Sequence, residues 1–321
     1  MGETKLHTGL GNPLLGWLTG EVLPGEQVVE ARPLEGGVNH EMVAVSVLSG
    51  DRYVVRRYRR HNPCALELAL AQRLAGVVPS VEVVGADLTG EASGEPTLVY
   101  RYVDGEPLDL VLDRQSRSTA AESETLGRSV GQVLAQFAAV GFAAPGAFRE
   151  GSLEPDGTDV LIDPLDAVDR ALAAGHAARV LTGREQRDLL ALALASTHRV
   201  DSVAGARQLV HMDFNPKNLV VHRVHGRWEV AAVLDWEFAF SGSPLTDVGN
   251  MLRFSENYPR EYVAGFHDGY VDAGGVLPPD WFEISRALDL FTLADILAHP
   301  PEGDMFSRVA ALVRRRLGDS T

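Results

Sequence analysis

The sequence predicts an α+β fold, with a β-rich segment up to about residue 103 and a longer, mainly helical part after it. Runs of β-branched and aromatic residues separated by turn residues fill the first hundred positions. Apolar residues then recur at helical spacing, interrupted by one pair of strand-like runs. We therefore expect an N-terminal lobe over residues 1–103 and a C-terminal lobe over 104–321, with the junction at the turn Asp104-Gly105.

Three elements are expected in the N-terminal lobe. Residues 41–58 (EMVAVSVLSGDRYVVRRY) form two β-rich runs around a Ser-Gly-Asp turn, which indicates a hairpin. Residues 63–75 have helical composition and begin with Pro63, which suits the first turn of a helix. Residues 97–103 (TLVYRYV) form a further strand.

The C-terminal lobe shows several helical patterns. Thr182 with Glu185 is a capping-box pattern ahead of a leucine-rich run, which places a helix start there. The final run VAALVRRRLG, with three arginines before a glycine, suits a helix C-terminus. Two further helices are indicated by one-sided apolar spacing, in one case Leu126, Val130, Leu134 and Phe137, and in the other Ile284, Leu288, Phe291 and Asp295.

Composition excludes several classes of protein. The chain has 321 residues, 45% hydrophobic and 23% charged, which is ordinary for a globular protein. The net charge of -15 argues against a nucleic-acid partner, because such binding relies on Lys and Arg at phosphates. The basic run at residues 56–60 is interpreted as a strand end with a solvated flank. A single cysteine, Cys64, rules out a disulfide framework and fits a reducing cytoplasm.

We expect neither a membrane partner nor export. No stretch approaches the ~18 apolar residues of a membrane helix, and the N-terminus lacks the pattern of a signal peptide. Nothing in the sequence predicts an oligomeric state.

The strand-like runs 219–224 and 228–236 predict a hairpin that turns near Gly226. Paired positions then sum to about 452, which places Asn218 opposite residue 234, beside Asp235. Asp213 lies on the loop just before the hairpin. Converging amide and carboxylate oxygens suit Mg²⁺ rather than a soft metal.

The spacing of these residues indicates a reaction. His211, Asp213 and Asn218 stand in the frame H-x-D-x-x-x-x-N, and Asp235 follows one hairpin later. This frame repeats the kinase catalytic loop, in which an Asp accepts the proton of an attacking hydroxyl. The Asn and the later Asp hold Mg²⁺ against nucleotide phosphates in that chemistry.

With HMDFNPKN at 211–218 and VLDWEFA at 233–239, the chain resembles the aminoglycoside phosphotransferase family, within the wider kinase-like superfamily of small-molecule kinases. The resemblance covers roughly residues 30–300. It implies a bilobal, protein-kinase-like fold with a nucleotide-binding N-terminal lobe. It also implies an enzyme that transfers the γ-phosphoryl group of ATP or GTP, with Mg²⁺, to a hydroxyl of a small-molecule acceptor.

The resemblance assigns roles residue by residue. Asp213 matches the catalytic base, and Asn218 and Asp235 match the metal ligands. Asp247, in GSPLTDVGN, matches an Asp that hydrogen-bonds the catalytic loop, and His211 matches a structural position.

Other positions depart from the pattern. Met212 stands where the family usually has Gly and protein kinases have Arg, so regulation by activation-loop phosphorylation is not expected. Trp236-Glu237 replaces the Phe-Gly of protein kinases. Asn215 replaces a Lys of the protein-kinase loop, which makes Lys217 the candidate phosphate contact.

The N-terminal lobe supplies candidate nucleotide-binding residues. A glycine-containing turn over LEGGVNHEMVAV allows close approach of the backbone to phosphates. Arg56 falls where kinases keep a strand Lys and Glu67 where its partner sits, although such a pair could equally be a surface salt bridge. The full candidate set is Gly36, Gly37, Asn39, Arg56, Glu67, and Arg101 and Val103, whose main-chain groups would hold the adenine.

Acidic residues indicate the kind of acceptor. Residues 261–304 carry nine acidic side chains and one basic residue, Arg286, a net formal charge of -8. Asp268, Asp289 and Asp295 are candidate acceptor ligands, and Asp289 and Asp295 interrupt an apolar run where an acid needs a partner. A region of one sign concentrates ligands of the other sign, which favours an aminoglycoside-like antibiotic whose phosphorylation would give resistance. A neutral hydroxylated antibiotic or a metabolic acceptor of choline, sugar or homoserine type stays open, as does simple solvation of helix faces.

Three other hypotheses compete with the kinase. His211, Asp213 and Asp235, with His267 as an additional candidate, could form a metal-dependent hydrolase site, but Asn218 would then be idle. The chain could be a non-catalytic nucleotide-binding scaffold, but the base and both metal ligands are intact. HMDFNPKN could also be a plain polar turn before a core strand.

Overall fold

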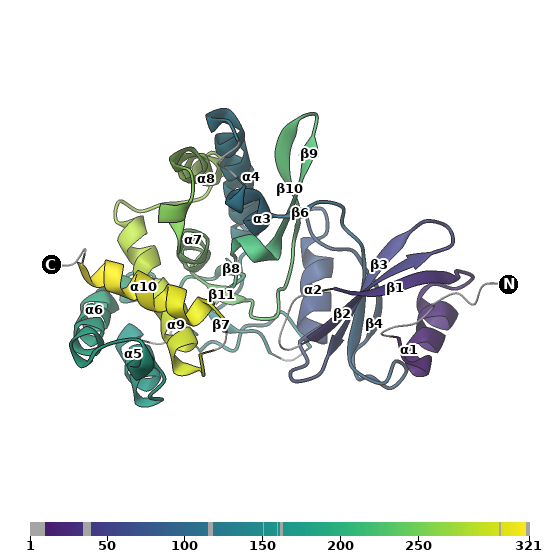
Figure 1. Ribbon diagram of the computed structural model, residues 1–321, viewed down its shortest axis with the longest axis horizontal. Helices are drawn as coiled ribbons and strands as arrows, with labels where there is room; N and C mark the ends of the chain where they lie inside the picture. The colour runs from purple at the N-terminus through teal and green to yellow at the C-terminus, as the bar shows by residue number, and fades with distance from the viewer. Residues whose placement is uncertain are drawn as a thin grey trace. The chain divides into compact units, whose positions relative to one another are not determined.

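The computed structural model describes residues 10–34, 40–114, 118–149, 151–158, 160, 163–301 and 303–318. The chain divides into two compact units (Figure 1). The sheet unit consists of Met1–Leu108, Arg149–Leu153 and Lys217–Glu237. The helical unit consists of Asp109–Phe148, Glu154–Pro216 and Phe238–Thr321. The predicted α+β class is confirmed.

The sheet unit is built on a five-stranded antiparallel sheet in the order β1-β2-β3-β5-β4. The predicted hairpin is confirmed as β2 and β3, and the predicted helix is confirmed as α2 (Cys64–Leu74). The strands are β1 (Val28–Leu34), β2 (His40–Val47), β3 (Arg52–Tyr58), β4 (Val83–Asp87) and β5 (Thr97–Arg101).

Alternation along β3 decides what each side chain meets. Tyr53 and Val55 pack into a core that includes Trp17 and Leu18, from α1 (Asn12–Trp17) and the π-helical turn that follows it (Leu18–Val22). Tyr58 packs on the other face, with Cys64 of α2. Successive side chains of a strand point to opposite faces, so Arg56 shares the face of Tyr58 and is directed toward α2.

The second hairpin pairs β9 (Leu219–Val224) with β10 (Arg227–Val233). Leu219 pairs with Val233, so the predicted register sum of 452 is confirmed at the open end. Although the sequence placed this hairpin in the C-terminal lobe, the structure groups it with the sheet unit. The reason is that β6 (Glu106–Pro107) pairs with β9, and that Ser80 forms a bridge with Val233.

The helical unit contains the predicted helices and several others. The capping boxes of α4 and α6 are formed by Thr119 with Glu122 and by Thr182 with Glu185. The helices of this part of the chain are α3 (Leu108–Asp113), α4 (Ala120–Ala138), α5 (Pro164–Ala173), α6 (Gly183–Asp201), α7 (Leu245–Met251), α8 (Arg260–Asp272), α9 (Trp281–Ala298) and α10 (Met305–Gly318), with 3₁₀ turns at Ala177–Arg179 and Ser255–Asn257. A further 3₁₀ turn, Pro216–Asn218, begins in this unit and ends in the sheet unit.

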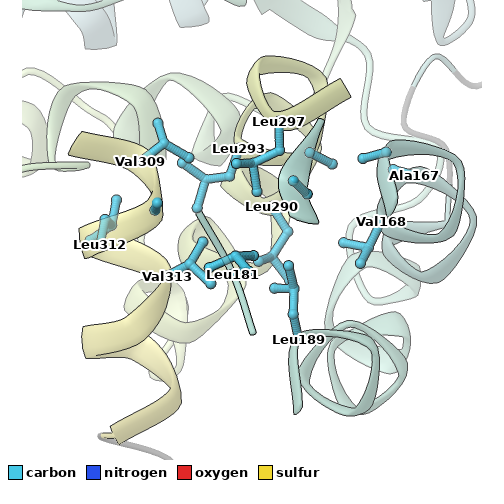
Figure 2. Packing of buried hydrophobic residues seen from close by; sticks show 14 of the residues in the cluster. Ala167, Val168, Leu181, Leu189, Leu290, Leu293, Leu297, Val309, Leu312 and Val313 are labelled. Atoms are coloured by element: carbon cyan, nitrogen blue, oxygen red, sulfur yellow. The ribbon is translucent and has the colours of Figure 1, made fainter. Parts of the chain in front are cut away.

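Helices α5, α6, α9 and α10 share one hydrophobic core (Figure 2). Leu290, Leu293 and Leu297 of α9 point into this core, where Val309 and Val313 of α10 meet them. Burial of each such side chain contributes roughly 1.5–3 kcal/mol to folding stability. Helices α9 and α10 are therefore firmly packed in the helical unit.

A short three-stranded sheet in the helical unit leads into the predicted catalytic loop. Its strands lie in the order β7 (Gly146–Ala147), β11 (Phe240–Gly242) and β8 (Gln208–Val210), and the loop begins where β8 ends. Phe214 of the loop is fully buried and packs edge-on against Phe137 of α4, with ring centroids 5.3 Å apart. The loop is thereby anchored in the core of the helical unit.

Within the described part of the chain, none of the helices combines the length and the apolar character needed to span a membrane.

Candidate active site

The predicted site residues fall in both units. Strained backbone marks both sets. Among the described residues other than glycine, only Met212, His225 and Asp235 have positive φ angles, of 73°, 49° and 66°. His225 is explained by its place in the tight turn of the β9–β10 hairpin, where such angles are favoured. Met212 adjoins the predicted base and Asp235 is a predicted metal ligand, and strain of this kind gathers at functional sites.

In the sheet unit, the open end of the hairpin brings Asn218 and Asp235 together as predicted. The backbone N–H of Leu234 donates to the carbonyl of Asn218 at 2.8 Å, which fixes the two strands at this point. Asp235 is the next residue, and its side chain is 23% exposed. One amide and one carboxylate are therefore positioned by a single hairpin.

Arg56 lies among three carboxylates of the sheet unit. Its guanidinium contacts Asp235 at 2.7 Å, Glu67 at 3.3 Å and Glu237 at 3.7 Å. Arg56 and Glu67 are each only 5% exposed, so their pair is not the surface salt bridge that remained an alternative. The interpretation of residues 56–60 as a solvated flank is wrong for Arg56, because β3 directs this side chain under α2. Removing one partner of such a buried pair typically costs about 3–5 kcal/mol.

Two tyrosines that the sequence analysis missed fix Glu67. The hydroxyl of Tyr100 donates to Glu67 at 2.6 Å and lies 3.1 Å from the hydroxyl of Tyr58. Burial raises the pKa of both tyrosines, so both stay protonated and able to donate. Burial also raises the pKa of Glu67, although the charge of Arg56 opposes that rise. Tyr58 lies two residues after Arg56 on β3, so strand alternation could have placed it on the same face as Arg56.

The donor set fits a hard divalent cation. Glu67, Asp235 and Glu237 each offer an oxygen atom within 4.8 Å of the others, and Arg56 balances only one of their three charges. Oδ1 of Asp235 accepts from Arg56, while no described residue donates to Oδ2. Carboxylate and amide oxygens are the ligands that Mg²⁺ prefers, so Asp235 and Asn218 are the residues that would hold it.

In the helical unit, Asp213 is held by its own loop. The amide of Asn215 donates to Oδ1 of Asp213 at 2.7 Å, and the backbone N–H of Asp213 donates to Nδ1 of His211 at 3.2 Å. His211 is completely buried, which agrees with the structural position expected for it. These bonds set the direction of the Asp213 carboxylate before any ligand arrives.

Asp247 of α7 holds the backbone of the same loop. Its two carboxylate oxygens accept the backbone N–H groups of His211 at 2.7 Å and of Met212 at 2.9 Å. Burial raises the pKa of Asp247 to about 7, against the opposing effect of these two hydrogen bonds. The contacts are those expected of a loop-supporting Asp.

Asp289 does not await a substrate group. It is 1% exposed, and its carboxylate is taken by Arg253 at 2.7 Å and by Arg316 at 2.7 Å. The prediction that it binds the acceptor is wrong, because two arginines from α10 and the residues just after α7 already compensate its charge. Nothing local in ALDLFTLADIL reveals partners that lie 36 and 27 residues away.

The other two predicted acceptor acids are exposed. Asp268 is 51% exposed and contacts Arg128 at 3.6 Å and His267 at 3.0 Å. Asp295 is 62% exposed and lies 3.9 Å from His299. Both carboxylates lie on helix surfaces of the helical unit.

The remaining predicted nucleotide and phosphate contacts differ in how far the structure describes them. Gly36, Gly37 and Asn39 lie outside the described residues. The backbone N–H of Arg101 donates to the carbonyl of Glu82 at 2.8 Å, so an adenine contact would use other main-chain groups of Arg101 or Val103. Lys217 is exposed at the 3₁₀ turn that precedes β9.

The comparison with protein families agrees with this geometry. The model of the phosphotransferase enzyme family matches residues 30–285, most of the chain. This chain belongs to the phosphotransferase enzyme family. It is therefore an enzyme of the phosphotransferase class, and the resemblance noted in its sequence is confirmed. No match to this phosphotransferase was found among curated protein sequences.

Solved structures show that the phosphotransferase has the fold of kinase-like aminoglycoside phosphotransferases. Aminoglycoside phosphotransferase APH(4)-Ia is 19% identical, with a TM-score of 0.64 over 91% of this chain and 93% of that one. The GDP complex of aminoglycoside 2'-phosphotransferase-IIIa is 16% identical, with a TM-score of 0.64 over 96% and 97%. A putative fructosamine-3-kinase from Thermobifida fusca is 18% identical, with a TM-score of 0.58 over 91% and 95%.

The hydrolase alternative loses its support. Among the described residues, the one group of three or more possible metal ligands is Glu67, Asp235 and Glu237. Within the helical unit His211, Asp213 and His267 form no such group, and His267 instead contacts Asp268 on α8.

Proposed function

We propose that this phosphotransferase moves the γ-phosphoryl group of ATP or GTP to a hydroxyl of a small molecule, with Mg²⁺. The observation that carries the proposal is the hairpin register, which places Asn218 beside Asp235 at one strand end. Asp213 precedes Asn218 by five residues on a loop held by Asp247. Nucleotide complexes among solved structures of the same fold, with ADP, GDP or AMP-PNP, agree with it.

The chemistry assigns one task to each residue. The acceptor oxygen forms a bond to the γ-phosphorus, the bond to the β–γ bridging oxygen breaks, and the nucleoside diphosphate leaves with the electron pair. Asp213 orients the acceptor hydroxyl and takes its proton. Bound Mg²⁺ would supply charge stabilisation to the phosphates, and Asn218 and Asp235 would hold it. Arg56, fixed by Glu67, would contribute positive charge to the phosphates, with Lys217 as a further phosphate contact.

We propose an amine-bearing, polyhydroxylated antibiotic such as an aminoglycoside as the acceptor, phosphorylated and so inactivated. The acidic stretch 261–304 supports a cationic acceptor, with Asp268 and Asp295 as the exposed acids that could contact it. A ternary complex of APH(4)-Ia with AMP-PNP and hygromycin B shows such an acceptor on this fold. The putative fructosamine-3-kinase supports the second candidate, a metabolic kinase that acts on a sugar derivative. Location in a reducing cytoplasm stays a prediction from the single cysteine.

A nucleotide-consumption screen tests the proposal. Purified protein with Mg²⁺ and either ATP or GTP is offered hygromycin B, other aminoglycosides, fructosamines, choline and neutral antibiotics. We expect ADP or GDP release that depends on one acceptor class and on Mg²⁺. Phosphate release from a phosphoester without any nucleotide would contradict the proposal.

Asp213→Asn is the sharpest single variant. The amide keeps the shape of the side chain but cannot take a proton, so we expect kcat to fall by ~10²–10⁴-fold while nucleotide affinity stays near that of the wild type. Asn215→Ala, which removes a hydrogen-bond donor to Oδ1 of Asp213 but keeps the base, serves as a milder comparison. Turnover of Asp213→Asn within a few-fold of wild type would show that the base has been assigned wrongly.

A further inference from the structure

Asn250 connects a buried ion cluster to the backbone beside Asp213. Its side-chain amide donates to the carbonyl of Met212, the residue immediately before Asp213. Its side-chain oxygen accepts from the guanidinium of Arg253. Asn250 is 2% exposed and lies on α7 one turn after Asp247, so the two residues share one face of that helix.

Arg253, which contacts Asn250, belongs to a buried cluster of charged residues. Arg253 donates from Nε to Oδ1 of Asp289 at 2.8 Å, and Arg316 donates to Oδ2 of the same carboxylate at 2.7 Å. These residues come from three different segments, just after α7, on α9 and on α10, and each is at most 7% exposed. Charge-assisted hydrogen bonds of this kind have fixed geometry, so Arg253 has little freedom to move away from Asn250.

The backbone that Asn250 contacts, at Met212, has an unfavourable conformation. Met212 has a φ of 73°, in the left-handed region that is unfavourable for any residue other than glycine. Asp247 fixes the N–H of Met212 and Asn250 fixes its carbonyl, so both ends of this residue are restrained. Without the second restraint the peptide between Met212 and Asp213 could rotate, and the Asp213 side chain would turn with it.

We propose that Asn250, held by Arg253 together with Asp289 and Arg316, is a positioning residue that aims the carboxylate of Asp213. The inference rests on the proposed role of Asp213 as the base. In it, the buried acid Asp289 holds Arg253 in place against Asn250. Asn250 touches no reacting atom, so its loss acts on kcat through Asp213 and leaves nucleotide binding unchanged.

Asn250→Asp is the test variant, made in the full chain. It keeps the side-chain shape and an oxygen for Arg253 but faces the Met212 carbonyl with an acceptor instead of a donor. Thr292→Val is the matched control, because the hydroxyl of Thr292 makes only a 3.4 Å contact with the oxygen of Asn250. Asn250→Ala carries the same test if Asn250→Asp does not fold, as judged by thermal unfolding.

Turnover is followed as ADP release from Mg²⁺–ATP, with hygromycin B as acceptor and with water alone. We expect kcat of Asn250→Asp to fall by about tenfold to a hundredfold, with the KM for ATP within about twofold of wild type. Thr292→Val should keep both constants. Amide hydrogen exchange over residues 210–216 should quicken in Asn250→Asp and not in Thr292→Val.

A double variant separates this inference from the proposed function. If Asn250 acts through Asp213, adding Asn250→Asp to Asp213→Asn should lower kcat no further. Multiplication of the two effects, or a normal kcat per folded Asn250→Asp molecule, would overturn the positioning role and leave the base intact. Full turnover in Asp213→Asn, or no release of ADP or GDP by the wild type with any acceptor of the screen, would instead overturn the proposed function.

Discussion

Met212 is a residue whose backbone does not suit its side chain. Its φ of 73° favours glycine. The family resemblance of the sequence likewise implies Gly at this position. In the interior of a helix or strand, Gly makes a protein less stable than Ala does by roughly 0.5–1 kcal/mol. At residue 212 the order should be reversed.

We expect Met212→Gly to have a free energy of unfolding about 1 kcal/mol above that of Met212→Ala, because both lose the side chain and only Ala keeps the strain. Urea unfolding of the two variants measures the difference. Each variant serves as the control for the other, since the comparison is internal to one position. If Met212→Ala proved equal to or more stable than Met212→Gly, residue 212 would not hold a left-handed backbone in solution.

Asp247 should give the enzyme a particular pH dependence. Burial raises its pKa to about 7 from an ordinary value of 3.8. Between these values the folded state binds the proton more tightly than the unfolded chain, so this group's contribution to stability falls as pH rises from about 4 to about 7.

The comparison of wild type with Asp247→Asn isolates that contribution, because the amide does not titrate. We expect the stability difference between wild type and variant to shift against the wild type by roughly 1 kcal/mol per pH unit inside this window, and to level off above it. Chemical unfolding at several pH values from about 4 to about 8 measures it. A difference that stays constant, or that moves in the wild type's favour as pH rises, would mean that burial does not dominate at Asp247.

At the scale of elements, the sequence predicts features that depend on neighbouring residues, but not contacts between residues far apart in the chain. The hairpin register follows from one turn, so the meeting of Asn218 and Asp235 could be derived from the sequence. The partners of Asp289 could not, because Arg253 and Arg316 reach it only after three separate segments have packed. For the same reason Asp289 looked like an unsatisfied acid in an apolar helix.

The β9–β10 hairpin should behave as one metal-binding element. Changing a residue that merely orients a metal ligand typically costs about 10–100-fold in metal affinity, so losing a ligand charge should cost at least about tenfold. We therefore expect Asp235→Asn to raise the Mg²⁺ concentration for half-maximal turnover by about tenfold or more. Asn218→Ala should raise it less, because it removes a neutral ligand.

Initial rates over a Mg²⁺ titration at fixed nucleotide measure both effects, and His222→Ala, on the same hairpin, is the control. An unchanged Mg²⁺ requirement in Asp235→Asn would exclude the hairpin end as the metal site.

At the scale of the whole molecule, the sequence predicted the class of fold but not how its parts are grouped. The segment Lys217–Glu237 belongs to the sheet unit, although helical sequence surrounds it on both sides. The contact that decides this is the pairing of β6 with β9, which places Gly105 so close that a Cβ there would lie 2.6 Å from the carbonyl oxygen of Val221. A two-residue strand such as β6 leaves no periodic signal to read.

The negative charge of the molecule should affect how its acceptor binds. The chain carries a net charge of -15, and a surplus of eight negative charges falls in residues 261–304. A field of this sign concentrates cationic ligands, and salt weakens it because the screening length is about 10 Å at 0.1 M ionic strength. For an amine-bearing acceptor we therefore expect KM to rise several-fold between about 0.05 M and about 0.5 M salt, while kcat changes little. Asp268→Asn should reduce that dependence, whereas Asp304→Asn, an exposed acid at the start of α10 beside Arg308, should not. A best acceptor that is uncharged, with a KM independent of salt, would refute the electrostatic choice of acceptor and leave the phosphotransferase chemistry standing.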